Sequence, residues 1–185
     1  MQKIPQTQLK VGDLIFQSLL HQDEMTMAIN SSHISKKVEH MGIIVSDGIV
    51  VEATIEDGVI QTPLESFLQK GAINLAYRFK DELIIPKVCN YIQEQIGMPY
   101  NDSFLDEADG FYCSELVEKA ANYAKAGCFK SAKLNFCLSG SDVIAPFWKL
   151  YYEERNLSVP QGAKGSHPAG LMKQSEAIYL LGYVF

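Results

Sequence analysis

The chain has 185 residues, 47% of them hydrophobic, and a formal net charge of −6 at pH 7. This length indicates one domain over residues 1–185, with enough apolar residues for a substantial core. An acidic chain whose lysines are scattered lacks the clustered cations that phosphate groups require, which argues against a nucleic-acid partner. No apolar run reaches the roughly 18 residues of a membrane-spanning helix, so we expect no transmembrane segment.

The opening stretch, MQKIPQTQLKVGDLIF, lacks the basic segment and long apolar segment of a secretory signal. As written, the chain fits a cytoplasmic protein. It equally fits a periplasmic or cell-envelope protein whose signal peptide has been removed, and the sequence leaves both locations open.

The first half of the chain is rich in predicted strands. VGDLIFQSLL (11–20) follows a Gly-Asp turn, and HMGIIV and IVVEATI are β-branched runs joined by Ser-Asp-Gly. A second Asp-Gly precedes VIQTPL, which predicts a three-stranded meander over 40–62. The polar stretch 21–39 is predicted to be mostly loop around a short helix. INLAYRF (73–79) and the closing EAIYLLGYVF (176–185) are further predicted strands.

The predicted helices differ in length and character. LESFLQK (64–70) is a short amphipathic helix, and IIPKVCNYIQEQIG (84–97) begins near a proline and stops at a glycine. A longer helix begins at Cys113 and ends by Gly127. Its apolar residues recur at helical spacing and form one face: Cys113, Leu116, Val117, Ala120, Ala121 and Ala124. The polar residues Glu115, Glu118, Lys119 and Asn122 occupy the other side. The fold class is therefore α+β, a mainly antiparallel sheet packed against helices.

Cys113 stands in the first turn of this helix. Unpaired N–H groups and the helix dipole favour an anion there, and the thiolate is the nucleophilic form of cysteine. The same N–H groups suit the oxyanion formed when a thiolate attacks a carbonyl. The alternative interpretation is a small buried hydrophobe at an apolar helix position.

The other three cysteines carry weaker signals. Four cysteines allow two disulfides, but a chain of this size folds without them. No pair has the C-x-x-C spacing of a zinc or redox site. The four cysteines are Cys89, Cys113, Cys128 and Cys137. We expect at least three of their thiols to be ordinary buried or half-buried groups.

A cysteine nucleophile needs a base and a group that orients the base. His40 opens the apolar run HMGIIV, where a strand end would let it face a cleft. His21 and His33 are predicted surface residues, and His167 is a loop histidine that could line a pocket. Glu52 is a lone carboxylate inside VVEAT.

The position of Glu52 relative to His40 depends on strand register. Pairing through Ser-Asp-Gly sets residues whose numbers sum to about 95 opposite each other, which places Glu52 near residue 43. A slipped or bulged register would let Glu52 reach the His40 ring diagonally. Otherwise Glu52 lies on the solvent face of an edge strand.

Four motifs in order carry a family resemblance: GDLIFQ, HMGIIV, VVEAT and FYCSELV. Together they resemble the YiiX/YaeF family, in the permuted branch of the NlpC-type, papain-like cysteine peptidase superfamily. In this branch the histidine and the polar third residue precede the cysteine. The resemblance implies that Cys113 is the nucleophile, His40 the general base and Glu52 the residue that orients it. It also implies that Tyr112 shapes the site, with its hydroxyl and the Cys113 N–H as oxyanion donors.

Three functions remain open at this stage. The leading one is a cysteine hydrolase that cleaves an amide bond in a cell-wall-derived or other small peptide. An acyltransferase or thioesterase acting on lipid acyl groups is the neighbouring possibility, with the aromatics of APFWKLYYEE (145–154) lining an acyl groove. A non-catalytic module that binds a small amine or peptide is the third, although such a relative usually lacks the cysteine or the histidine.

Other chemistries find little support in the sequence. The scattered histidines and cysteines predict no metal site and no cofactor, and G-x-S-x-G of serine hydrolases is absent. The acidic loop NDSFLDEADG (101–110) does not match a calcium loop. It would meet an ammonium group of the substrate or, as we favour, lie in solvent.

Overall fold

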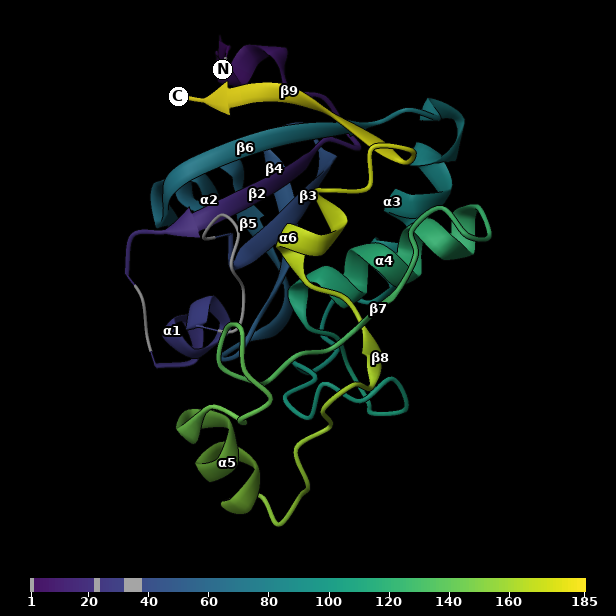
Figure 1. Cartoon of the computed structure of the whole chain (residues 1–185). Coiled ribbons are helices and arrows are strands. Elements are labelled where there is room, and N and C mark those ends of the chain that lie inside the picture. Colours follow the sequence, from purple (N-terminus) through teal and green to yellow (C-terminus); the bar gives the residue numbers. More distant parts are fainter. Residues whose placement is uncertain (1, 22–23, 32–37) are drawn as a thin grey trace.

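The computed structural model describes residues 2–21, 24–31 and 38–185, and the structural statements below concern these residues. Its main feature is a seven-stranded sheet in the order β1-β9-β6-β2-β3-β4-β5 (Figure 1). Every neighbouring pair is antiparallel except β1 and β9. The strands of this sheet are β1 (Lys3–Ile4), β2 (Leu14–Leu19), β3 (His40–Ser46), β4 (Ile49–Thr54), β5 (Gly58–Pro63), β6 (Gly71–Phe79) and β9 (Ile178–Val184).

A two-stranded sheet and several helices complete the described chain. The short sheet consists of β7 (Ala132–Lys133) and β8 (Lys164–Gly165). The α-helices are α1 (Glu24–Ser31), α2 (Leu64–Lys70), α3 (Ile85–Glu94), α4 (Cys113–Ala124), α5 (Pro146–Glu153) and α6 (Pro168–Leu171). Two short 3-10 turns are η1 (Gln6–Gln8) and η2 (Glu82–Ile84). None of these helices has the length and apolarity to cross a bilayer.

The sheet is covered on both faces because its central strands are apolar on both sides. In β2, Leu14 and Phe16 join the main core, whereas Ile15 joins the cluster on the other face. This alternation follows from the two-residue period of a strand. The main core contains residues of α3, α4 and α6, and the second cluster contains Phe67 and Leu68 of α2.

The structure confirms the predicted α+β class and most of the predicted elements. The strand in 11–20, the meander over 40–62 and the strands near 73–79 and 176–185 are β2, β3–β5, β6 and β9. The short helix expected within 21–39 is α1, and His33, predicted at the surface, lies outside the described residues. The acidic loop contains no regular element.

Helix α4 lies against β3 and β4, and its apolar face is buried as predicted. Ala120 and Ala121 are both 0% exposed, since their small side chains let the helix approach the sheet closely. The other side of its first turns is less exposed than its polarity suggests. Glu115 and Glu118 are also buried, because the acidic loop and the β7–β8 region cover them.

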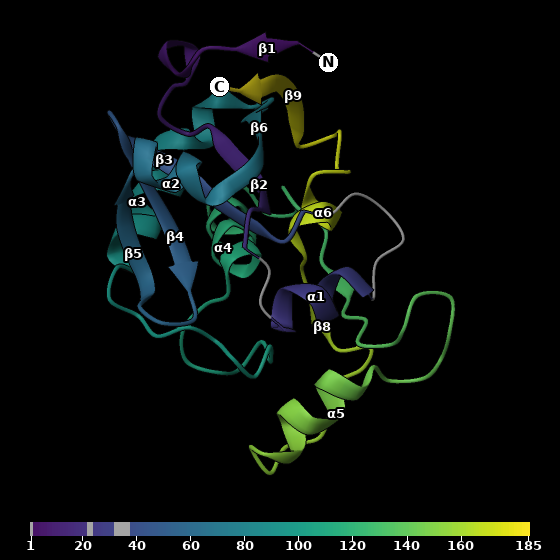
Figure 2. The same cartoon turned by 90° about the vertical axis from the view of Figure 1, so that its left-hand side faces the viewer.

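A third, aromatic cluster surrounds α5. This helix lies away from the main sheet (Figure 2). The stretch APFWKLYYEE, considered above only for its aromatic content, forms this helix. Trp148 is 2% exposed and packs edge-on against Phe104 and Phe136. This cluster borders the first turn of α4 through the contact of Phe104 with Tyr112.

Candidate active site

Cys113 and His40 meet where α4 and β3 begin. Cys113 is the first residue of α4, and His40 is the first residue of β3. The Cys113 sulfur lies 4.0 Å from the carbonyl oxygen of Glu39, the residue before His40, and the His40 and Cys113 side chains are hydrogen-bonded. The two residues are 73 positions apart in the sequence. They meet because α4 packs against the sheet at the start of β3.

Glu52 completes a line of three side chains. Its Oε2 lies 2.7 Å from His40 Nε2. Glu52 pairs with Gly42 in the β3–β4 ladder, and the register shifts between Ile44 and Ser46, so the carboxylate reaches the ring diagonally. Glu52 is 1% exposed, and β4 lies between β3 and β5, so the alternative of a solvent-facing edge position is wrong.

The far oxygen of Glu52 is held by two residues that the sequence did not single out. Glu52 Oε1 accepts hydrogen bonds from Thr62 Oγ1 at 2.5 Å and from Lys70 Nζ at 2.6 Å. Thr62 belongs to β5 and Lys70 ends α2. No local pattern marks either residue, because their role arises from the pairing of β4 with β5 and the packing of α2.

These contacts set the charges of the line. Burial would raise the pKa of Glu52, but the bonds with His40, Lys70 and Thr62 outweigh it and lower that pKa to about 2. Burial would likewise lower the pKa of His40, but its bonds with Cys113 and Glu52 raise it to about 9. Because Glu52 is an ionised acceptor, His40 Nε2 carries a proton, and Nδ1 is the ring nitrogen left for the Cys113 sulfur.

The other cysteines differ from Cys113 in their surroundings. All four thiols are free, so the two-disulfide alternative does not hold. Burial raises the pKa of the Cys89 thiol to about 11, and burial also raises that of Cys128. Cys137 is buried, and none of these three has a histidine hydrogen-bonded to it among the described residues.

Two pockets open on either side of Cys113. The first, which we call the aromatic pocket, has a volume of about 150 Å³. Its lining includes Tyr100, Phe104, Tyr112, Phe136 and Trp148, together with Cys113. Trp148 therefore places the APFWKLYYEE segment at the site, as the acyl-groove alternative required.

The second pocket, which we call the polar cleft, has a volume of about 290 Å³. It is lined by His40, Glu52, Glu39, Glu56, Lys70 and Cys113, among others. Its described lining includes His40, whereas that of the aromatic pocket does not. Cys113, Tyr100 and Glu39 line both pockets, so Cys113 lies where the two pockets meet.

Tyr112 and Tyr100 flank the sulfur in different ways. The Tyr112 hydroxyl accepts a hydrogen bond from the Ser166 N–H at 3.0 Å, and its ring lines the aromatic pocket. Its role as an oxyanion donor stays a prediction. Tyr100 was not predicted; burial raises its pKa, and the nearby Cys113 raises it further. Its hydroxyl has no hydrogen-bond partner within the described ranges.

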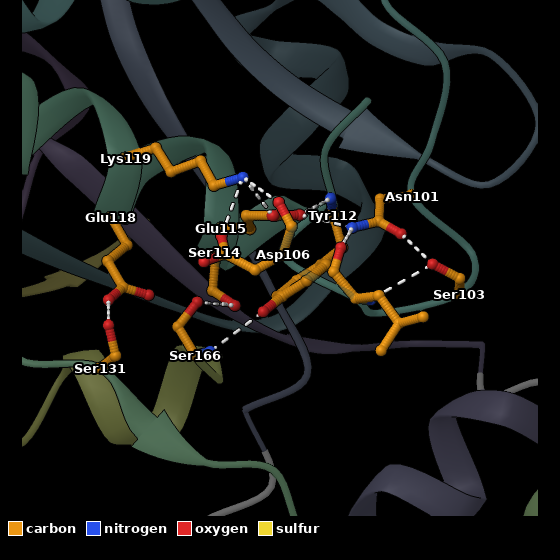
Figure 3. Close-up of polar contacts among 11 residues, drawn as sticks. Asn101, Ser103, Asp106, Tyr112, Ser114, Glu115, Glu118, Lys119, Ser131 and Ser166 are labelled. Atoms are coloured by element: carbon orange, nitrogen blue, oxygen red, sulfur yellow. Dashed lines mark hydrogen bonds and ion pairs between the residues drawn. The ribbon is translucent and has the colours of Figure 1, made fainter. Parts of the chain in front are cut away.

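A polar network anchors the first turns of α4 (Figure 3). Lys119 bridges Glu115 at 2.8 Å and Asp106 at 3.1 Å, and Asn101 donates to Glu115 at 3.0 Å. On the opposite side, Ser114 and Ser166 hydroxyls are hydrogen-bonded at 3.1 Å. The helix end that presents Cys113 is thus tied to the acidic loop and to the segment after β8.

The other candidates from the sequence, which are the acidic loop, His167 and His21, lie outside the line of Glu52, His40 and Cys113 in the described chain. No carboxylate of the acidic loop lines the aromatic pocket or the polar cleft in the described chain, and Asp106 pairs with Lys119 instead. His167 lines the aromatic pocket and accepts the Ala169 N–H at 3.1 Å. His21 is exposed. Across the described ranges, no three His, Cys, Asp or Glu side chains form a group that could hold a metal ion.

Comparisons with known proteins establish the fold and the family of the chain. A solved structure, described as the metalloprotein yiiX from Escherichia coli O157:H7, is similar with a TM-score of 0.76 and 22% identity. The similarity covers 95% of this chain and 97% of that one, and at this identity it establishes the fold. No curated protein matches the chain.

A family model is more specific. The model described as "Permuted papain-like amidase enzyme, YaeF/YiiX, C92 family" matches residues 8–162. This range includes His40, Glu52 and Cys113, in the permuted order. The chain therefore belongs to the YaeF/YiiX, C92 family of permuted papain-like amidases and is an enzyme that hydrolyses amide bonds.

Proposed function

We propose that the enzyme cleaves amides that join an apolar acyl group to a polar amine, through a thioester on Cys113. The observation that carries this proposal is the position of Cys113 between two unlike pockets, of which the polar cleft contains His40 and the aromatic pocket does not. The general acid must stand beside the leaving nitrogen. The amine therefore occupies the polar cleft, and the acyl group occupies the aromatic pocket.

The first half of the reaction forms the thioester. The Cys113 thiolate attacks the carbonyl carbon, and the carbonyl oxygen gains the negative charge. The Cys113 N–H is suited to this oxyanion, because it is in the first turn of α4 and has no acceptor within the described ranges. The hydroxyl of Tyr100, a residue that lines both pockets, is a second donor candidate. The intermediate collapses as His40 Nδ1 gives its proton to the leaving nitrogen.

The second half releases the acid. His40, now neutral, takes a proton from water entering the polar cleft, and the hydroxide attacks the thioester carbon. The sulfur leaves as a thiolate beside the reprotonated imidazole, which restores the starting state. Glu52 keeps Nε2 protonated through both halves, so that Nδ1 alone exchanges protons with the substrate.

These residues do not fit a metal-dependent route. The similar E. coli protein is described as a metalloprotein. In this chain, Glu52 is occupied by His40 on one oxygen and by Thr62 and Lys70 on the other, and a lysine cation beside a carboxylate opposes metal binding.

The size of the aromatic pocket defines the acyl group. A cavity of about 150 Å³ with mainly apolar walls accommodates an aromatic ring or a short alkyl chain. A small peptide with an apolar residue on the acyl side meets this requirement. So does a lipid-like acyl chain, and the same apolar lining makes acyl transfer or thioester hydrolysis the second candidate function.

A set of N-acyl-lysines tests the proposal, since Glu56, which lines only the polar cleft of the two pockets, suits a cationic amine there. Hexanoyl-lysine and phenylacetyl-lysine are compared with acetyl-lysine and succinyl-lysine, and released lysine is measured. We expect the apolar acyl groups to be preferred at least about tenfold in kcat/KM. Cys113→Ala is the inactive control. Equal rates for all four, or a preference for succinyl, would refute the acyl assignment. Cleavage of a hexanoyl thioester but of no amide would favour the second candidate.

A further inference from the structure

The Glu52 carboxylate is held from both sides, and the far side carries a charge. His40 Nε2 lies 2.7 Å from Oε2, and Lys70 Nζ lies 2.6 Å from Oε1. The Glu52 side chain is 0% exposed, whereas that of Lys70 is 42% exposed. The lysine therefore reaches in from solvent, at the end of α2, to a buried carboxylate that a histidine already contacts.

Thr62 makes the orientation of Glu52 largely independent of Lys70. The Thr62 hydroxyl donates to the same Oε1 at 2.5 Å and belongs to β5, whose pairing with β4 is regular along its whole length. Loss of the lysine thus leaves the carboxylate hydrogen-bonded and facing His40. What the lysine adds, beyond one hydrogen bond, is a positive charge.

The other charged and titratable groups around this pair do not duplicate that charge. Those lining the same cleft from neighbouring elements are Glu39, Glu56, Tyr100 and Cys113. Within the described ranges, Lys70 is the one cationic side chain in the cleft apart from His40. It is therefore the group that offsets the negative charge of Glu52 as His40 gains its proton.

We propose that Lys70 acts through Glu52, by its charge, to set the pH range in which His40 and Cys113 form their imidazolium–thiolate pair. A nearby cation makes each proton on the Glu52–His40–Cys113 line easier to lose. With Lys70 present, the thiolate forms at lower pH and the imidazolium is also lost at lower pH. Without it, both limits of the range move to higher pH. This inference rests on the proposed thiolate mechanism.

Site-resolved alkylation tests the proposal without a substrate. Iodoacetamide labelling of Cys113 is followed by mass spectrometry from pH 4 to 10, and the His40 ring is titrated by NMR after assignment with His40→Ala. In Lys70→Met we expect both steps of the labelling profile, and the His40 titration, to move up by about 0.5 to 1 in pH. Lys70→Arg, which keeps the charge, should restore the original profile.

The control is Lys125→Met, which removes the lysine of a 2.7 Å ion pair with Asp81. Neither residue of this pair lines the polar cleft. The profile of this variant should equal that of the unmodified enzyme. A Lys70→Met profile that stays in place or moves to lower pH would overturn the proposal, and Lys70→Gln repeats the test if the methionine variant does not fold. If unmodified Cys113 shows no low-pH step, the thiolate mechanism itself fails, which is a distinguishable result.

Discussion

At the scale of single residues, the site depends on how two oxygens of one carboxylate are used. Glu52 Oε2 faces His40, and Oε1 faces two donors, Thr62 and Lys70. The carboxylate therefore has a fixed orientation, and the imidazole has a fixed tautomer. His40 Nδ1 is left as the one ring nitrogen for the sulfur and the substrate.

This arrangement predicts a severe effect for Glu52→Gln. Thr62 and Lys70 both need an acceptor, so the glutamine oxygen will face them and its NH2 group will face His40. His40 Nε2 must then accept, and its proton moves to Nδ1, where the ring cannot take the thiol proton. We expect kcat to fall by roughly 10² to 10⁴-fold with the fold intact, measured on the best N-acyl-lysine.

The matched control for that substitution is Glu65→Gln, an exposed carboxylate on the helix that carries Lys70. It should leave kcat unchanged. A Glu52→Gln enzyme with unaltered turnover would remove Glu52 from the catalytic line.

At the scale of elements, α4 carries both residues of the main core and the proposed nucleophile, Cys113. Its buried face fixes where the helix begins, and the helix begins at Cys113. The apolar periodicity predicted this helix and its face correctly, because its small and apolar residues all pack on the sheet. Burial of Glu115 and Glu118 was not visible in that pattern, since their cover comes from the distant segments shown in part in Figure 3.

The packing of α4 predicts a clear effect on stability. Leu116 is 1% exposed within the main core, and Leu116→Ala leaves a cavity beneath the first turn of the helix. We expect this change to lower the free energy of unfolding by about 2 to 5 kcal/mol in urea melts. The same change at Leu150, which is 56% exposed on α5, should cost less than about 1 kcal/mol. Equal costs at the two positions would contradict the packing described for α4.

At the scale of the whole molecule, the order of motifs was more informative than any one of them. The sequence predicted the meander and the α4 helix, because strand period and turn residues are local properties. The reach of Glu52 to His40 depends on a register shift that the sequence left open, and only the family resemblance implied this contact. The sequence did not predict Lys70, Thr62 or Tyr100, because tertiary packing alone brings them to the site. The aromatic pocket likewise combines residues from the acidic loop, α4, α5 and the segment around α6.

The proposed role of Cys113 as nucleophile requires that its thiol, beside His40, is the most reactive of the four cysteines. Alkylation of each cysteine against pH, in the native enzyme and in His40→Ala, tests it most directly. We expect labelling of Cys113 to reach a plateau well below pH 8 and to rise again only as His40 loses its proton near pH 9. Cys89, whose pKa is raised to about 11, should stay unlabelled at neutral pH, and His40→Ala should suppress the Cys113 plateau. Equal labelling of all four cysteines, or an inert Cys113 in the folded enzyme, would contradict the proposal that Cys113 is the nucleophile.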